Sequence, residues 1–151
     1  MTFEEKNITV SLINFTLILG YSLIRLFQMI STESFNSTNV IRLWVTTIIL
    51  AIVLTVAVTI ATHIITAIIQ AIKSGGEEPE IEDLKDERDK LIDLKGTRVA
   101  FFVTSVGTFF AMLSFALGQP PLVMFTIMVV VGLIAQICRD LSRLILYRRG
   151  F

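Results

Sequence analysis

The chain has 151 residues, of which 54% are hydrophobic and 17% are charged, whereas ordinary soluble domains contain about 45–50% apolar and about 25% charged residues. This composition argues against a soluble globular domain. Thirteen Lys and Arg residues balance thirteen Asp and Glu residues, but residues 99–138 carry no charge and residues 43–72 carry only the titratable His63. Because a membrane-spanning helix needs about 20 apolar residues, these stretches indicate spanning segments.

Two spans are expected in the first half of the chain. The first covers about 8–30 and is followed by a polar, turn-forming stretch at residues 31–39. An acidic excess precedes it where signal peptides are basic, so we expect it to be retained as an anchor. The second covers about 42–72, roughly 45 Å as a helix, and must tilt or protrude because the hydrocarbon layer is about 30 Å thick. Its many β-branched residues would favour a strand in water, but in lipid a helix satisfies its own backbone.

A charged cytoplasmic segment at residues 73–98 separates the second span from the third. Gly75, Gly76 and Pro79 end the second span. The apolar residues that follow within 80–95, together with oppositely charged residues four apart, predict a short amphipathic helix.

The last two spans form a hairpin. They cover about 99–117 and 122–146, and Pro120 and Pro121 between them cannot continue a helix. The sequence therefore predicts an all-α fold, an integral membrane four-helix bundle that forms a single membrane domain over residues 1–151, with a short amphipathic cytoplasmic helix before the third span.

The basic residues set the expected orientation, because Lys and Arg in short loops favour the cytoplasmic side. Lys6 lies before the first span, six basic residues lie in the segment between the second and third spans, and four arginines lie at the carboxyl end, whereas the other two loops offer only Arg42. Both termini are therefore expected in the cytoplasm.

Each predicted helix carries one stripe of polar or small residues when it is projected at 100° per residue. On the first span the stripe holds Ser11, Asn14, Tyr21, Ser22 and Arg25, with Thr16 and Gly20 as a pair of small residues behind it. The stripes of the second and fourth spans supply a candidate polar pathway or packing seam, which consists of Thr55, Thr59, Thr62, His63, Thr66 and Gln136. One interpretation is close helix packing with hydrogen bonds between helices; the other is a hydrated pathway for an ion or solute.

Charged residues in or beside the spans are candidate functional groups, because charge is costly in lipid. They are Arg25, Arg98, Arg139, Asp140 and Arg143. Arg25 and Arg139 lie near span ends, where long side chains extend to the headgroups. We expect Arg98 to face Arg139, Asp140 and Arg143 in a charge network that fixes helix registry.

Catalytic and metal-binding residues find little support in the sequence. His63 is the only candidate pH-responsive group within the spans, and it has no second His, Cys or Asp at ligand spacing. Cys138 has apolar neighbours typical of a packed thiol, and no phosphate loop or nucleophile elbow occurs. We therefore expect no enzyme activity, no metal site and no cofactor.

The charged segment could bind a partner. Nine acidic against five basic residues from Ser74 to Arg98 argue against nucleic-acid binding and against a polybasic lipid patch, and the spacing of a calcium loop is absent. A solvated charged helix remains, or a helix that docks a second copy or a cytosolic or membrane protein. The candidate docking face consists of Ile81, Leu84, Leu91 and Leu94.

Residues 86–100, DERDKLIDLKGTRVA, also carry a resemblance. Asp-Glu-Arg followed by aliphatic and basic residues and an Arg before the third span resembles the signature of small uncharacterised four-span prokaryotic membrane proteins, a domain of unknown function. The resemblance implies a location in the plasma (inner) membrane of a bacterium or archaeon, and it implies no chemistry.

Two functions remain open from the sequence. The first is a non-catalytic polytopic membrane protein that acts in membrane protein interaction or regulation as a homo-oligomer, because a small four-helix unit leaves small-residue faces for a neighbour. The alternative is a small transporter or channel with a polar pathway lined by the second span.

Overall fold

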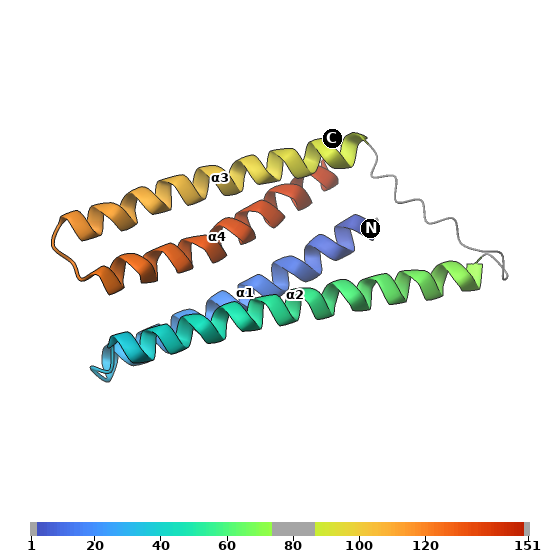
Figure 1. Ribbon diagram of the computed structural model, residues 1–151. Coiled ribbons are helices and arrows are strands. Elements are labelled where there is room, and N and C mark those ends of the chain that lie inside the picture. Colours follow the sequence, from blue (N-terminus) through green and yellow to red (C-terminus); the bar gives the residue numbers. More distant parts are fainter. Residues whose placement is uncertain (1–2, 74–86, 150–151) are drawn as a thin grey trace.

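Four helices make up the described part of the chain. The computed structural model describes residues 3–73 and 87–149, without the side chains of residues 3, 62, 63, 66, 69–71 and 73. The helices are α1 (Phe3–Ser31), α2 (Ser37–Lys73), α3 (Glu87–Ala116) and α4 (Pro121–Arg148) (Figure 1). Each is long and apolar enough to cross a membrane. The predicted all-α bundle with four spans is confirmed at this level, and the helices suggest a multi-pass protein in contact with a lipid bilayer.

Two short turns lie at one end of the bundle, and both termini lie at the other (Figure 1). In the first turn the Oδ1 atom of Asn36 accepts a hydrogen bond from the backbone N–H of Asn39 at 2.9 Å, so Asn36 caps α2. In the second turn Gly118 has a φ of 85°, a conformation that favours glycine after a helix. Pro121 then begins α4, a position where its missing N–H costs nothing.

The helix α4 lies at the centre of the packing. The backbone of α3 approaches only that of α4 within the described residues, whereas α1 packs on both α4 and α2, and α2 approaches α4 only slightly. α4 is thus the element through which α3 is joined to the rest of the bundle.

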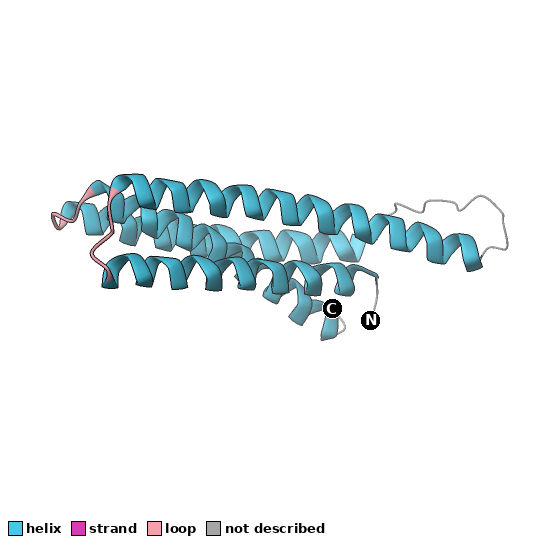
Figure 2. Cartoon of the chain, turned by 90° about the horizontal axis from the view of Figure 1, so that it is seen from below, coloured by secondary structure: helices cyan, strands magenta, loops and turns pink. Residues whose placement is uncertain are grey.

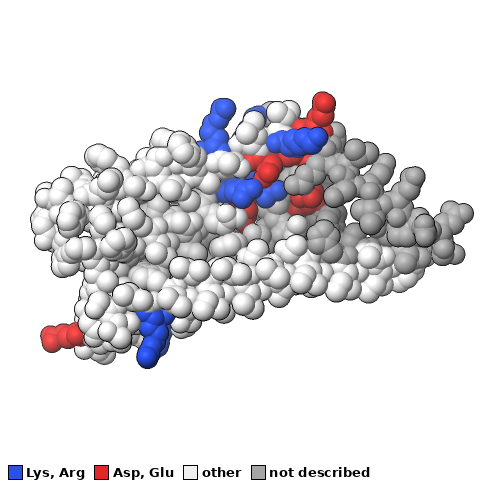
Figure 3. Space-filling view, viewed as in Figure 1, with Lys and Arg blue, Asp and Glu red and all other residues white. Residues whose placement is uncertain are grey.

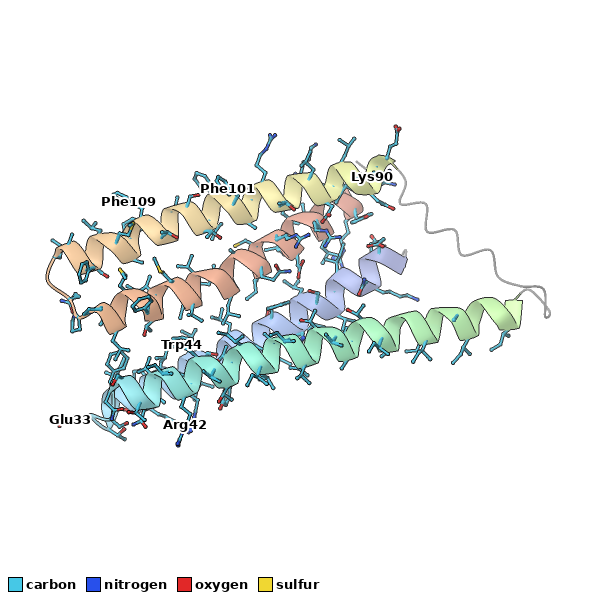
Figure 4. All side chains as sticks on the ribbon, viewed as in Figure 1. Glu33, Arg42, Trp44, Lys90, Phe101 and Phe109 are labelled. Atoms are coloured by element: carbon cyan, nitrogen blue, oxygen red, sulfur yellow. The ribbon has the colours of Figure 1, made fainter. Side chains whose placement is uncertain are left out.

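Two clusters of buried side chains hold the helices together. Leu26, Val40, Leu43 and Trp44 pack against α4 near the turns, and a second cluster lies near the termini and joins α1, α3 and α4: Ile8, Ile92, Leu144 and Tyr147. Most other large apolar side chains are exposed, as expected where lipid replaces water. On α3, for example, Phe101 and Phe109 point away from α4 (Figure 4).

Within the described residues, the amphipathic helix expected before the third span is not separate from that span. From Glu87 onward its residues form the first turns of α3, which continues without a break to Ala116. The reason is local: residues 87–98 contain no proline and are rich in good helix formers, and the single Gly96 does not end a helix. The first part of the predicted helix, residues 80–86, lies outside the described residues.

The length of α2 sets it apart. Its 37 residues span about 55 Å at 1.5 Å per residue, and its C-terminal end extends well past the other three helices (Figure 2). The predicted second span therefore protrudes.

Candidate functional site

Charged side chains gather at the end of the bundle that holds the termini (Figure 3). At their centre is one face of α4, whose polar residues recur at three- and four-residue intervals that place them on one side of a helix: Gln136, Arg139, Asp140, Arg143 and Tyr147. We call these residues, with their partners on α1 and α3, the inner network.

The most buried charged group of the inner network is Asp140, which is 1% exposed. Ser11 Oγ on α1 donates a hydrogen bond to Asp140 Oδ2 at 2.6 Å. Gln136 Nε2 lies 3.4 Å from both carboxylate oxygens, and the Arg143 NH1 atom lies 3.8 Å from Oδ1. A buried carboxylate needs such partners because the loss of its hydration is otherwise uncompensated.

The two arginines of the inner network share one acid on α3. Arg139 NH2 donates to Asp93 Oδ1 at 2.9 Å, and Arg143 Nε lies 3.4 Å from the same oxygen. Arg143 NH2 also lies 3.9 Å from Glu4 Oε2 at the start of α1. These ion pairs connect three helices at one level.

Near its start, α3 presents Asp89, Asp93 and Gly96 to α4, and these residues are spaced four and three apart. Tyr147 on α4 donates a hydrogen bond to Asp89 Oδ1 at 2.6 Å. A Cβ atom at Gly96 would lie 2.6 Å from Cγ of Arg143. The glycine thus makes room for the arginine to cross α3.

A polar cavity of about 160 Å³ adjoins the inner network between α1, α2 and α4. Its lining includes Asn7, Ser11 and Asn14 of α1, Thr55 and Thr59 of α2, and Gln136, Asp140 and Arg143 of α4. The cavity has room for several water molecules and the polar partners to hold them. Polar side chains from three helices therefore surround this space.

This inner cavity lies near one boundary of the hydrocarbon layer. A distance of about 20 residues along a helix corresponds to the layer's thickness of about 30 Å. Counted from Arg25 on α1, from Arg42 on α2 and from the turn between α3 and α4, that distance ends within about six residues of Ser11, Thr59, Gly96 and Asp140. The inner network is thus an interfacial structure.

The predicted pathway residues are only partly brought together. Thr55, Thr59 and Gln136 line the inner cavity, and the Thr59 hydroxyl donates to the backbone carbonyl oxygen of Thr55 at 2.8 Å. The side chains of Thr62, His63 and Thr66 lie outside the described residues.

The predicted charge network is found with a different member on α3. Arg139, Asp140 and Arg143 take part, but Arg98 is exposed and makes no ion pair in the part of the chain that the structure describes. The expectation for Arg98 was wrong because five residues of α-helix separate it from Asp93, a rotation of about 140° that places it on another face.

Several members of the inner network were missed in the sequence. The sequence places Asp89 and Asp93 in a solvated charged segment, and it gives no sign of a role for Glu4 or Tyr147. The spacing of Asp89, Asp93 and Gly96 was the available signal, since it places two acids and a glycine on one helical face. Asp140 was expected at a span end, but its burial requires the packing of α1 against α4.

The remaining predicted residues lie apart from the inner network. Arg25 is exposed near the turn between α1 and α2. Leu91 and Leu94, half of the predicted docking face, are 51% and 59% exposed, and Ile81 and Leu84 lie outside the described residues. The Cys138 thiol, expected to be packed, is only partly buried.

A buried polar contact closes the space between α1 and α2 in the middle of the bundle. Ser22 and Thr47 are 0% and 1% exposed, and their hydroxyl oxygens lie 3.1 Å apart in a hydrogen bond. Ile18, one turn further toward the inner cavity, is also buried. These side chains separate the inner cavity from a second cavity near the turn, which is lined by Tyr21 and Arg25 among others.

The chemistry of the inner network is that of paired charges. No group of three or more His, Cys, Asp or Glu side chains is arranged to hold a metal ion among the residues described. Comparisons with family models, with curated proteins and with solved structures find no match. The resemblance drawn from residues 86–100 therefore stays a prediction, and the coarser statement stands, that four long apolar helices suggest a four-span membrane protein.

Proposed function

We propose that this chain is a non-catalytic membrane protein that acts through protein–protein contact as a homo-oligomer, with both termini in the cytoplasm of a bacterium or archaeon. The observation that carries the proposal is the extension of α2 past the rest of the bundle (Figure 2). Its support is the number of consecutive uncharged residues in each helix.

The charge-free lengths differ between the helices. α1 has no charged residue over 7–24, α3 over 99–116 and α4 over 121–138, which is 18 residues each. On α2 the corresponding stretch, residues 43–72, has 30 residues. The excess of 12 residues corresponds to about 18 Å of helix, so the end of α2 reaches beyond the level at which the other helices become charged.

This extension of α2, residues 61–72, carries exposed apolar side chains among its described residues. Ile64, Ile65, Ile68 and Ile72 are each more than half exposed. Beyond the hydrocarbon layer such surface meets headgroups or water, at a cost of about 25 cal/mol per Å². Exposed apolar patches of this kind mark interaction sites.

A second copy of the same chain is the occupant that fits this surface. The extension carries no Asp, Glu, Lys or Arg before Lys73, so it brings no permanent charges of two copies together. Ala61, Ile64 and Ile68 follow the three-then-four spacing of a coiled-coil seam. When two copies are related by a two-fold axis along the membrane normal, residues at the same depth face each other. The α2 extension of one copy then packs against the α2 extension of the other.

Cysteine cross-linking in lipid tests the proposal. In a Cys138→Ser background, Ile68→Cys should form a disulfide-linked dimer, whereas Phe101→Cys, 74% exposed on the lipid-facing side of α3, should not. The double substitution Ile64→Asn with Ile68→Asn should lower the dimer fraction, and Thr97→Asn on α3 should leave it unchanged. Equal cross-linking at positions 68 and 101 would contradict the proposal.

A small transporter or channel is the second candidate, favoured by the two cavities on either side of the Ser22–Thr47 contact. Flux of protons, ions or a small solute into liposomes should then fall when Thr59→Phe fills the inner cavity. The adjacent Ile60→Phe, on an exposed position, is the matched control. Absence of flux in the unmodified protein would remove this candidate and leave the first untouched.

A further inference from the structure

A second and larger cavity lies between α1 and α2 at the end of the bundle that holds the turns. Its volume is about 450 Å³. Ten residues line it: Tyr21, Arg25, Gln28, Met29, Thr32, Ser34, Asn39, Arg42, Leu43 and Thr46. We call it the outer cavity.

Two guanidinium groups give the outer cavity a positive charge. Arg25 comes from α1 and Arg42 from α2, and the lining contains no acidic side chain. Neither arginine forms an ion pair within the described parts of the chain. Arg42 lies beside the turn between the two helices (Figure 4).

The hydrogen-bonding capacity of these arginines is largely unused. The Arg25 NH1 atom donates to Gln28 Oε1 at 3.2 Å, which leaves most of its five donors free. By contrast, the hydroxyl groups of Thr32 and Thr46 donate to carbonyl oxygens of their own helices. Most of the hydrogen-bond donors that the outer cavity offers to a ligand are therefore guanidinium N–H groups.

The depth of the outer cavity matches that of lipid headgroups. Arg25 lies six residues before the end of α1, and Arg42 lies five residues after the start of α2, so each is about 8–9 Å from the turn. The headgroup regions extend the bilayer from about 30 Å to about 40–45 Å in total. Met29 and Leu43 supply apolar surface beside the two charges.

We propose that the outer cavity binds a phosphate group, held between Arg25 and Arg42. A guanidinium matches phosphate oxygens with two parallel hydrogen bonds, and two guanidiniums from adjacent helices can hold one anion from both sides. The phosphate belongs either to an outer-leaflet phospholipid or to a free phosphate-type solute. This site does not depend on the α2 extension.

The first measurement is lipid retention by the full chain. The protein is purified in a neutral detergent, supplied with phosphatidylglycerol or with a phosphate-free glycolipid of the same acyl chains, and analysed by native mass spectrometry. Retained phosphatidylglycerol should fall at least about tenfold when Arg25→Gln and Arg42→Gln are combined, since each removes charge-assisted hydrogen bonds. Arg148→Gln, at the other end of the bundle, should retain as much as the unmodified chain.

The second measurement is titration with inorganic phosphate, followed by the fluorescence of the single tryptophan, Trp44, which lies on α2 close to Arg42 in sequence. Saturation by phosphate that is lost in the double Gln variant assigns the site to a free solute. Lipid retention without a phosphate response assigns it to the headgroup. Arg25→Lys with Arg42→Lys keeps the charge without the paired geometry and should bind at an intermediate level.

One set of results would overturn the proposal. It fails if the unmodified chain, the double Gln variant and Arg148→Gln retain both lipids equally and none responds to phosphate. Circular dichroism of each variant establishes that the helices are intact. If the double Gln variant still forms the dimer expected from the α2 extension, the failure concerns the outer cavity alone.

Discussion

The helices α3 and α4 pack tightly at Gly107, and adding a single methyl group there should loosen the bundle. A Cβ atom at this position would lie 2.5 Å from Cγ2 and 2.9 Å from Cβ of Val131, and closer still to Cγ1. Carbon atoms pack well only at about 3.5–4.0 Å. Val131 cannot turn away, because a β-branched side chain in a helix has one preferred rotamer and its Cβ is fixed.

The expected cost follows from these distances. Overpacking of this kind lowers the free energy of unfolding by about 1–3 kcal/mol. The higher helix propensity of alanine over glycine offsets up to about 1 kcal/mol of this loss. The backbone of α3 approaches only that of α4 in the described chain, so the position of α3 depends chiefly on this packing. Gly107→Ala should therefore lower the free energy of unfolding by about 1–2 kcal/mol.

Reversible unfolding in mixed micelles, followed by circular dichroism and by Trp44 fluorescence, measures this change. Gly132→Ala is the matched control, since a Cβ there meets nothing within 4 Å, and it should be neutral or slightly stabilising. In a Val131→Ala background the cost of Gly107→Ala should shrink by at least about 1 kcal/mol. The reasoning is refuted if Gly107→Ala is as harmless as Gly132→Ala and the two substitutions in the cycle are additive.

Three further substitutions probe the inner network and the first turn by the same unfolding measurement. Ser11→Ala removes the 2.6 Å hydrogen bond to Asp140 and should cost about 1.5–3 kcal/mol; a cost that persists in an Asp140→Ala background would contradict that contact. Gly96→Ala should displace the side chain of Arg143, whose Cγ lies 2.6 Å from the added atom, and cost about 1–3 kcal/mol; no loss would mean that α3 and α4 separate easily. Asn36→Ala removes the cap of α2 and should cost about 1 kcal/mol, with Asn36→Asp close to neutral.

The sequence alone determined the number of helices, their approximate ends and the common side of the two termini. Each of these features follows from a short, continuous stretch of sequence. Charge-free stretches of about 18 residues or more have few alternatives to helices in lipid, and residues such as Asn36, Gly118 and Pro121 mark the turns. The start of the third helix differs most from its predicted position, because a charged helical segment and an apolar one join without any local signal.

The tertiary structure decided which polar side chains meet. Ser11 and Asp140 are separated by 129 positions along the chain, and their contact depends on the rotation and register of α1 against α4. The same rotation of α3 brings Asp93 to the arginines of α4 and directs Arg98 away from them. Hydropathy fixes a helix along the membrane normal but leaves its rotation free, so the inner network and both cavities follow only from packing.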